Sequence, residues 1–370
     1  MKTILGVLAL LVAASPASAE NLPLTATQDG QSIVLNYDQS ARECRMRERS
    51  PGGWGPWSAW VPCPPSLTFT GPFTAGNKYR FDVRQVTAAS NILTFEGAPP
   101  PSACPETTPH VPGGPDGMDG CWPGPGNTGV PSGVTLTSYG GSCTINTPNT
   151  VIDGKIFNCA LTVTASNVVV RNSRINGRVV VNSGSLLIED SETILDDYSL
   201  RHLNGHNITA RRLNMRGGQS GGLCYNCVVE DSYVHDQTPD PTQKQHYSAF
   251  RMDQDLTLRH NTLMCNAPYG CSADLAGYGD FAPVQRNTIE RNLFMATEGG
   301  TCSYGGSSPS KPYSNDARDI VFRDNVFQKR NQYQSSGLCG HWYAILHFDA
   351  SRPGNIWENN RWDNGQLISP

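Results

Sequence analysis

Residues 168–175 read VVVRNSRI, and residues 186–193 repeat that pattern as LLIEDSET. In the first octet an apolar residue precedes Arg171, and another apolar residue follows four positions later. The second octet has Glu189 at the charged position and departs from the pattern only at Thr193. Inward apolar and outward polar positions over about eight residues are typical of short β-strands. The octets therefore indicate a structural repeat, and such a repeat decides the fold.

The charged position of the octet recurs along the second half of the chain, and its sign alternates at every step. Its members, here called the charge ladder, are Asp153, Arg171, Glu189, Arg211, Glu230, Arg259, Glu290, Arg323 and Glu358. Stacked parallel strands lie about 4.8 Å apart, so equivalent residues of successive coils are neighbours. Opposite charges stabilise such neighbours and like charges destabilise them. Alternation is therefore what stacked coils predict, and we expect the charge ladder to be structural.

The spacing of the charge ladder predicts a solenoid with insertions. Successive intervals are 18, 18, 22, 19, 29, 31, 33 and 35 residues. The shortest matches one coil of a parallel β-solenoid, and the growth indicates loops inserted into the later coils. Parallel crossover connections are normally right-handed. We therefore expect an all-β protein in which residues 132–370 form a right-handed parallel β-helix of about nine coils.

Asparagine and serine also recur within the octets. The residues are Asn172, Ser173, Ser191, Ser232, Asn261, Asn292, Asn325 and Asn360. Side chains of these types satisfy backbone groups at turns through hydrogen bonds. We expect an asparagine ladder with a structural role.

The start of the chain predicts export. Lys2, an apolar run over residues 4–13 and the small residues 17–19 form a secretory signal peptide, residues 1–19. The apolar run is too short to span a membrane, and no other stretch approaches that length. The formal net charge is −4, and −5 without Lys2, which argues against nonspecific binding of nucleic acid. We expect a protein that is secreted, whether extracellular or periplasmic, without a membrane span.

Two segments precede the solenoid. Residues 20–98 contain short strand-like runs separated by turns and predict a small β-sandwich. Their order of Cys44, a Trp-rich segment, Cys63 and residues 76–84 (GNKYRFDVR) resembles bacterial Ig-like or fibronectin-III-like repeats. The tryptophans can stack on sugars, although packing in a core is their commoner role. Residues 99–131 are rich in Pro and Gly and predict a linker without regular structure.

Twelve cysteines in an exported chain predict disulfides. The sequence leaves their connectivity open. Pairing between neighbours in the sequence would give Cys44–Cys63, Cys104–Cys121, Cys143–Cys159, Cys224–Cys227, Cys265–Cys271 and Cys302–Cys339. Cys224 and Cys227 form a CxxC, which suggests a redox or zinc site or a structural bridge. We expect the bridge, because neither a second CxxC nor a spaced His pair completes a zinc set.

Four segments carry a more specific resemblance. Residues 121–131 (CWPGPGNTGVP), 271–275 (CSADL), 304–313 (YGGSSPSKPY) and 348–357 are similar to a family of exported, actinobacterial-like right-handed β-helix proteins of the pectate-lyase-like superfamily. The resemblance implies the fold directly. It implies a carbohydrate-active function less directly, because the fold also serves adhesins and phage tailspikes. Where that family carries His-x-Asp-Gly, this chain has HYSA at residues 246–249, so the expected carboxylate is absent.

Insertions in a solenoid gather on one face, which is usually the binding face. Here they enlarge the coils between Glu230 and Glu358, and each of these coils has an additional strand-like run. The runs are residues 248–253, 271–276, 302–305 and 343–349. We expect their outward side chains to line a groove. The loops that would cover this groove are residues 237–245, 277–285 and 307–317.

β-Elimination on a uronic acid is one chemistry that this face allows. It needs a base to remove the C5 proton and a cation to neutralise the carboxylate. Arg251, Lys311 or His246 could supply these with a Tyr. Ca²⁺ held by aspartates could also supply the cation. The candidate aspartates are Asp253, Asp274 and Asp280.

Glycoside hydrolysis is the second chemistry, and it needs two carboxylates. Asp253 and Asp274, on adjacent coils, form the natural pair. Asp274 is the main catalytic candidate, because a carboxylate within a strand is costly unless it is solvated, paired or used. The alternative is a hydrogen-bonded turn carboxylate. An esterase is a third chemistry, but the chain has no GxSxG elbow to activate Ser248 or Ser272.

Other polar residues of the late coils are candidates for binding substrate. They are Tyr304, Lys311, Tyr313, His347 and Asp349. His347 and Asp349 alternate along one run, so both can face the groove. Alternatively, Asp349 caps the turn that precedes Pro353.

These observations favour a secreted, monomeric, carbohydrate-active protein that cleaves a uronate-bearing polysaccharide by elimination or hydrolysis. Ca²⁺ is the one cofactor they suggest. A surface protein that binds glycans without cleaving them is the alternative, because no catalytic motif is complete. A structural fibre or envelope component is a third class, although no stem for trimerisation is visible in the sequence.

Overall fold

The computed structural model describes the backbone of strands β1–β8 between residues 24 and 96, and then residues 104–118, 120–295, 297, 299, 301–329 and 343–370. Contacts divide the chain into one unit of Met1–Cys104 with Gly117–Gly120 and another of Pro105–Asp116 with Cys121–Pro370. The predicted signal peptide lies outside the described residues. In the described part of the chain, no helix has the length and apolar character needed to cross a membrane.

The first unit contains two antiparallel sheets, as expected for an all-β segment. One sheet holds β1 (Leu24–Asp29), β2 (Ser32–Tyr37) and β6 (Leu67–Thr70). The other holds β3 (Glu43–Ser50), β4 (Gly53–Trp54), β5 (Val61–Pro62), β7 (Lys78–Arg84) and β8 (Asn91–Glu96). The resemblance to Ig-like repeats stays a prediction.

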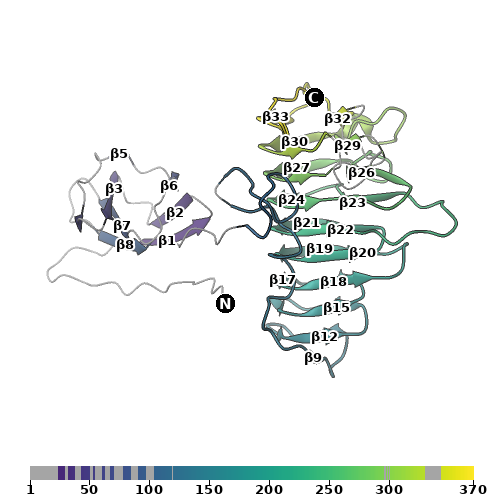
Figure 1. The fold of residues 1–370 in the computed structure, drawn as a ribbon, viewed down its shortest axis with the longest axis horizontal. Coiled ribbons are helices and arrows are strands. Elements are labelled where there is room, and N and C mark those ends of the chain that lie inside the picture. Colours follow the sequence, from purple (N-terminus) through teal and green to yellow (C-terminus); the bar gives the residue numbers. More distant parts are fainter. Residues whose placement is uncertain are drawn as a thin grey trace. The chain divides into compact units, whose positions relative to one another are not determined.

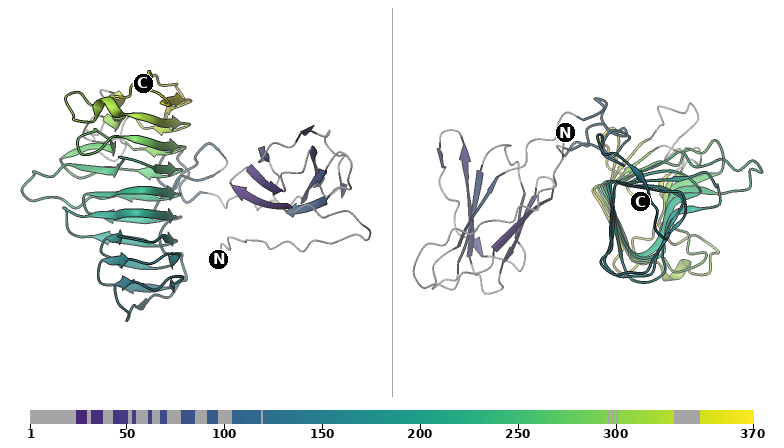
Figure 2. Two further views of the ribbon diagram at one scale, coloured as in Figure 1. Left: turned by 180° about the vertical axis from the view of Figure 1, so that it is seen from behind. Right: turned by 90° about the horizontal axis from the view of Figure 1, so that it is seen from below.

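The second unit is the predicted right-handed parallel β-helix, built from three parallel sheets that run along the stack of coils (Figures 1 and 2). The first sheet holds β10 (Thr144–Ile145), β11 (Val151–Asp153), β13 (Leu161–Val163), β14 (Val168–Arg171), β16 (Val179–Val181), β17 (Leu186–Glu189), β19 (Arg201–Arg211), β21 (Ser220–Glu230), β24 (Leu256–Arg259), β27 (Gln285–Glu290), β30 (Arg318–Arg323) and β33 (Ile356–Glu358). The second holds β9 (Thr137–Ser138), β12 (Lys155–Phe157), β15 (Arg174–Asn176), β18 (Glu192–Leu195), β20 (Asn214–Gly217), β22 (Tyr233–His235), β25 (Thr262–Leu263), β28 (Leu293–Phe294), β31 (Val326–Phe327) and β34 (Arg361–Trp362). The third holds β23 (Tyr247–Arg251), β26 (Cys271–Ala276), β29 (Thr301–Tyr304) and β32 (Tyr343–Leu346).

The inward positions of these strands form a continuous apolar core. Val168, Val170 and Ile188 are fully buried, whereas the residues between them along the same strands are half-buried. Equivalent side chains of successive coils stack on one another, as the rings of Phe294 and Phe327 do at 4.5 Å between centroids. The end-on view in Figure 2 shows the coils superimposed around this core. Burial of one apolar face per coil is what makes the short strands stable.

The charge ladder is confirmed at every step. All of its members pair in register with the next, from Asp153 with Arg171 to Arg323 with Glu358. Arg259 bridges two carboxylates, since its Nη1 lies 2.6 Å from Glu230 and its Nε lies 2.6 Å from Glu290. The ladder therefore joins neighbouring coils electrostatically.

The asparagine ladder is also confirmed, as a fully buried stack. Its members, here called the asparagine stack, are Ser173, Ser191, Ser232, Asn261, Asn292, Asn325 and Asn360. Each side-chain oxygen from Asn261 onward accepts the backbone amide of the preceding member at 2.9–3.1 Å. The expectation for Asn172 was wrong. Its backbone is left-handed, with φ 50°, and its side chain donates instead to Asp153.

Thr193, the exception in the octet pattern, has a partner inside the core. Its hydroxyl lies 2.7 Å from Nδ1 of His202, whose Nε2 lies 3.2 Å from the carbonyl of Gly217. Both side chains are fully buried. Burial lowers the pKa of His202 to about 3, so this histidine is a neutral hydrogen-bonding group.

Residues 105–116 and 121–131, here called the flanking segment, belong to the unit of the β-helix. These two ranges contain none of the β-strands of the described part of the chain. The buried Trp122 packs in an apolar cluster with Leu293 and Met295 and stacks on His260 at 5.4 Å. His260 lies between two carboxylates, with Nδ1 2.7 Å from Asp231 and Nε2 3.2 Å from Asp116 of the flanking segment. These contacts attach the flanking segment to the coils.

Three predicted disulfides are present, namely Cys143–Cys159, Cys224–Cys227 and Cys265–Cys271. Cys104, Cys121 and Cys302 are also disulfide-bonded. The predicted partner of Cys302, Cys339, lies outside the described residues, as does Cys63. The CxxC therefore forms a bridge, as expected.

Candidate functional site

The third sheet continues one side of the solenoid through the enlarged coils. Its strands pair in the order β23, β26, β29 and β32. The amide of Ser248, in β23, donates to the carbonyl of Gln219, just before β21, at 3.5 Å. The long strands β19 and β21 pair with each other along their length. Side chains from these strands therefore follow one another, coil by coil, along one side.

A continuous set of polar and aromatic side chains lies on this side. Its members, here called the polar cluster, are Arg201, Tyr225, Arg251, Asp253, Tyr278, Asp280, Tyr304 and His347. All of them are partly exposed except Asp253, which is buried with 9% of its surface exposed. They come from strands β19, β21, β23 and β29 and from the turns that follow β23, β26 and β32.

Asp253 is the carboxylic acid at the centre of the polar cluster. The hydroxyl of Tyr225 donates to its Oδ2 at 3.2 Å. Burial raises the pKa of Asp253, the hydrogen bond from Tyr225 and the charge of Arg251 oppose that rise, and Asp280 adds to it. The net direction is upward, so Asp253 keeps its proton to a higher pH than an exposed aspartate does. A carboxylic acid with this property is suited to proton donation.

Two guanidinium groups flank this acid. Nη2 of Arg251 lies 3.9 Å from Oδ2 of Asp280. Nε of Arg201 donates to the side-chain oxygen of Gln219 at 2.9 Å. Burial lowers the pKa of Arg201, and the charge of Arg251 lowers it further. Two half-buried cations close to one acid form a site that attracts an anionic group.

Aromatic rings continue the polar cluster toward the C-terminal coils. Arg251 lies over the ring of Tyr278 at 5.9 Å, and the rings of Tyr278 and Tyr304 are 4.5 Å apart. The ring of His347 follows at 5.7 Å from Tyr304, and its Nδ1 lies 3.0 Å from the hydroxyl of Ser308. Burial lowers the pKa of His347, which favours the neutral imidazole. Such rings offer faces on which a sugar ring can stack.

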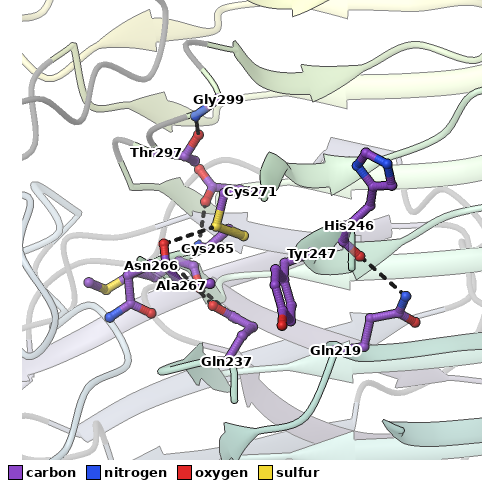
Figure 3. The surroundings of a disulfide bond; sticks show 12 residues. Gln219, Gln237, His246, Tyr247, Cys265, Asn266, Ala267, Cys271, Thr297 and Gly299 are labelled. Atoms are coloured by element: carbon purple, nitrogen blue, oxygen red, sulfur yellow. Dashed lines mark hydrogen bonds between the residues drawn. A yellow bond between two sulfur atoms is a disulfide. The ribbon is translucent and has the colours of Figure 1, made fainter. Parts of the chain in front are cut away.

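Asp274 is not exposed, as a carboxylate that lines the predicted groove would be. It is fully buried, and its Oδ1 accepts the backbone amide of Cys265 at 2.8 Å. Burial raises its pKa well above the ordinary value, and the hydrogen bond from Cys265 opposes that rise. Cys265 is joined to Cys271, the first residue of β26, by a disulfide (Figure 3). The pairing of Asp253 with Asp274 stays a prediction, and the carboxylate whose charge raises the pKa of Asp253 is Asp280.

Other predicted site residues lie in the turns and loops. The imidazole of His246 is exposed, and its backbone carbonyl accepts the side-chain amide of Gln219 at 3.2 Å (Figure 3). Lys311 and Tyr313 are exposed and lie in the loop that follows β29. The polar cluster, as defined by its contacts, includes neither these two residues nor His246.

The expectation that His347 and Asp349 alternate on one strand was wrong. Strand β32 ends at Leu346, and His347 has a left-handed backbone with φ 59°. Asp349 accepts hydrogen bonds from the amide and the hydroxyl of Ser351 and pairs with Arg352. These bonds lower its pKa. Asp349 therefore caps the turn, which was the alternative reading.

The suggested Ca²⁺ ligands do not fit a calcium ion. Asp253 accepts a hydrogen bond from the hydroxyl of Tyr225, Asp280 pairs with Arg251, and the buried Asp274 accepts the backbone amide of Cys265. A Ca²⁺ ion requires six to eight oxygen ligands, and arginine excludes cations. Among the described residues no group of three or more His, Cys, Asp or Glu is arranged to hold a metal ion.

Arg201 and Tyr225 are the members of the polar cluster that the sequence did not reveal. They lie on β19 and β21, which precede the long insertions that directed attention to later coils. A signal was available for Tyr225, because it stands between the two cysteines of the CxxC.

Neither a protein-family model nor a curated protein matches the chain. Among solved structures, the chain is similar to pectate lyase PelI from Erwinia chrysanthemi in complex with tetragalacturonic acid, with 13% identity, 74% of this chain and 84% of that chain covered, and a TM-score of 0.22. It is similar to pectate lyase Pel3 from Pectobacterium carotovorum, with 12% identity, 92% and 89% covered, and a TM-score of 0.22. The family 28 exopolygalacturonase of Yersinia enterocolitica has 11% identity, 84% and 74% covered, and a TM-score of 0.24. With scores this low the similarities carry no argument about the site, and the fold rests on the strand pairing described above.

Proposed function

We propose that the β-helix hydrolyses an extracellular polysaccharide that bears uronic acids, and that the reaction takes place at the polar cluster. The carrying observation is Asp253, a carboxylic acid of raised pKa beside Tyr225 and flanked by Arg201 and Arg251. In this proposal Asp253 protonates the leaving oxygen of the glycosidic bond. Asp280 acts as the second carboxylate, on water or on the sugar.

The remaining residues would bind the substrate. The guanidinium groups of Arg201 and Arg251 neutralise the carboxylate of one sugar residue, because planar cations bind carboxylates well. The rings of Tyr278, Tyr304 and His347 bind the neighbouring sugar through its apolar face. Elimination would need a strong base instead of an acid at the same place.

The test is the activity of Asp253→Asn on a panel of uronate-bearing and neutral polysaccharides. Release of reducing ends should fall by about 100-fold or more, because a general acid contributes on that order. Absorbance at 235 nm should not rise with the wild-type protein, and EDTA should not reduce its activity. Asp349→Asn is the matched control, since it makes the same change at the turn cap and should leave the activity intact. Full activity of Asp253→Asn would overturn the assignment.

A protein that only binds glycans is the second candidate, and the aromatic part of the polar cluster favours it. In that case the wild-type protein binds a polysaccharide saturably and releases no reducing ends. Tyr304→Ala would then weaken binding, whereas Asp253→Asn would bind nearly as well as the wild-type protein.

A further inference from the structure

A disulfide lies directly behind the polar cluster. Cys224 and Cys227 are 1% exposed and belong to the apolar core, while Tyr225 between them is half-buried on the outer side. The bridge therefore spans the inside of strand β21 at the point where Tyr225 leaves it on the outside. The carbonyl of Tyr225 lies 3.5 Å from Sγ of Cys227.

The strand bends at this bridge. Asn226 has a left-handed backbone with φ 51°, and the equivalent residue of the preceding coil, Asn207, has φ 56°. The two side chains are joined by a hydrogen bond of 2.7 Å. A bridge between residues that flank a left-handed residue limits the backbone angles of the four residues it encloses. It therefore limits the direction in which the Tyr225 side chain can point.

The direction of Tyr225 matters because of what its hydroxyl meets. The phenol donates to Asp253 at 3.2 Å, and its ring stacks on that of His206 at 5.3 Å. The charged groups that face Asp253 are Arg201 from β19, Arg251 from β23 and Asp280 from the turn after β26. Among the groups around the acid, Tyr225 is the neutral hydrogen-bond donor, and it lies between the two cysteines of the disulfide.

Global stability does not account for this bridge as well as local geometry does. A disulfide stabilises mainly by shortening the loops of the unfolded chain, and this effect grows with loop length. Cys224 and Cys227 are three positions apart in the sequence, whereas Cys143 and Cys159 are sixteen positions apart. The short bridge removes less entropy from the unfolded chain than the long one does.

We propose that the Cys224–Cys227 disulfide is a positioning group, which holds strand β21 so that the hydroxyl of Tyr225 meets the carboxyl group of Asp253. A role of the disulfide in catalysis rests on the proposed function, in which Asp253 is the acid of the reaction. The contact itself does not depend on any activity. Loss of the bridge should act on Asp253 through Tyr225.

The experiment is a titration of Asp253 in the full chain by carbon-detected NMR with labelled aspartate. The resonance is assigned by its absence in Asp253→Asn. A hydrogen bond to the charged form lowers the pKa of a carboxyl group, so Tyr225→Phe should raise the pKa of Asp253 by about half a unit or more. The double variant Cys224→Ala with Cys227→Ala should raise it in the same direction. Adding Tyr225→Phe to that double variant should cause little further change, because the two effects share one contact.

The matched control is Cys143→Ala with Cys159→Ala. It should lower the melting temperature more than removal of the short bridge does and leave the titration of Asp253 unchanged. The proposal is overturned if removing Cys224 and Cys227 leaves the titration as in the wild-type protein, or if the control shifts it equally. No turnover is measured, so a failure of the proposed function appears separately, as full activity of Asp253→Asn.

Discussion

Two sides of the same solenoid use polar residues in opposite ways. On the side of the charge ladder and the asparagine stack, each step of the ladder pairs opposite charges, and the stack holds serine or asparagine in every coil from Ser173 to Asn360 except at Leu213. On the side of the polar cluster the residue type changes along the strands, since Arg201 of β19 pairs with Ser220 of β21, and Tyr225 of β21 pairs with His206. Both sides are built on parallel strand pairing, although the pairing of β23 with β26 shifts register between Tyr247 and Ser248.

The difference teaches which polar residues the fold requires. A residue that recurs at equivalent positions interacts with the equivalent residue of the next coil and thereby stabilises the stack. The polar cluster is not stabilised by repeated residues of neighbouring coils. Burial also destabilises the charged form of its central acid and so raises the pKa of Asp253. Groups that stacking does not need and that burial disfavours are the ones to test for function. The following predictions concern residues that stabilise the stack, and they compare the effects of changing these residues with the effect of changing Asp253.

The largest effect on stability should come from the asparagine stack. The side-chain amide of Asn292 donates to the carbonyl of Leu258 at 2.9 Å, and its oxygen accepts the amide of Asn261 at 2.9 Å. Asn292→Ala would leave both backbone groups buried without these partners, at a cost of about 3 kcal/mol in the free energy of unfolding. The measurement is urea denaturation.

The matched control for this variant is Asn146→Ala, because Asn146 is exposed at a turn of an early coil. It should change the free energy of unfolding by about 0.5 kcal/mol or less. Activity on a polysaccharide, normalised to folded protein, should be the same for both variants. If Asn292→Ala reduced activity as Asp253→Asn does, the division between the two sides would fail.

An intermediate effect should come from His260, which joins the flanking segment to the coils. Burial alone would lower its pKa, but the hydrogen bonds to Asp116 and Asp231 outweigh burial and raise the pKa to about 9. The unfolded value is near 6.5. The stabilisation is therefore fully present below pH 6.5 and is lost as the pH rises through 9. Its size should be on the order of 1 to 3 kcal/mol.

The measurement compares the wild-type protein with His260→Asn by urea denaturation between pH 6 and pH 10. Asparagine tolerates the left-handed backbone at this position, where φ is 51°, so the change removes the charge without straining the turn. The difference in stability should shrink as the pH rises. The control is His246→Asn, which replaces an exposed histidine and should change the free energy of unfolding by about 0.5 kcal/mol or less at neutral pH. Parallel curves for the wild-type protein and His260→Asn would show that the ion pairs do not contribute.

For periodic features, the sequence predicted the individual residues correctly, because the partner of each residue is the equivalent residue of the next coil. The charge ladder and the members of the asparagine stack from Ser173 onward were predicted from their spacing. Aperiodic features could not be predicted in this way. Asp274 reads as a strand carboxylate, but it is fully buried and accepts the backbone amide of Cys265, nine residues before it. The contact between Tyr225 and Asp253 joins residues 28 positions apart on coils of unequal length.

The same limit explains the errors at the end of the solenoid. His347 and Asp349 alternate in the sequence, but the strand ends at Leu346 because His347 takes a left-handed conformation. Alternation predicts a shared face only while the backbone stays extended. The hydrogen bonds of Asp349 with Ser351, which a turn makes available, then decide its role.

The smallest effect should come from single members of the charge ladder, and its size should depend on position along the stack. Arg259 bridges two carboxylates in the middle of the solenoid and its side chain is 34% exposed, whereas Arg171 near the start pairs with Asp153 and is 48% exposed. Arg259→Gln should lower the free energy of unfolding by about 1 kcal/mol, and Arg171→Gln by a few tenths, because exposed single pairs contribute little. In 1 M salt, where charges are screened over about 3 Å, the difference between the variants should decrease. Equal losses for both, unaffected by salt, would mean that the alternation of sign preserves register by avoiding like charges and does not stabilise the stack by attraction.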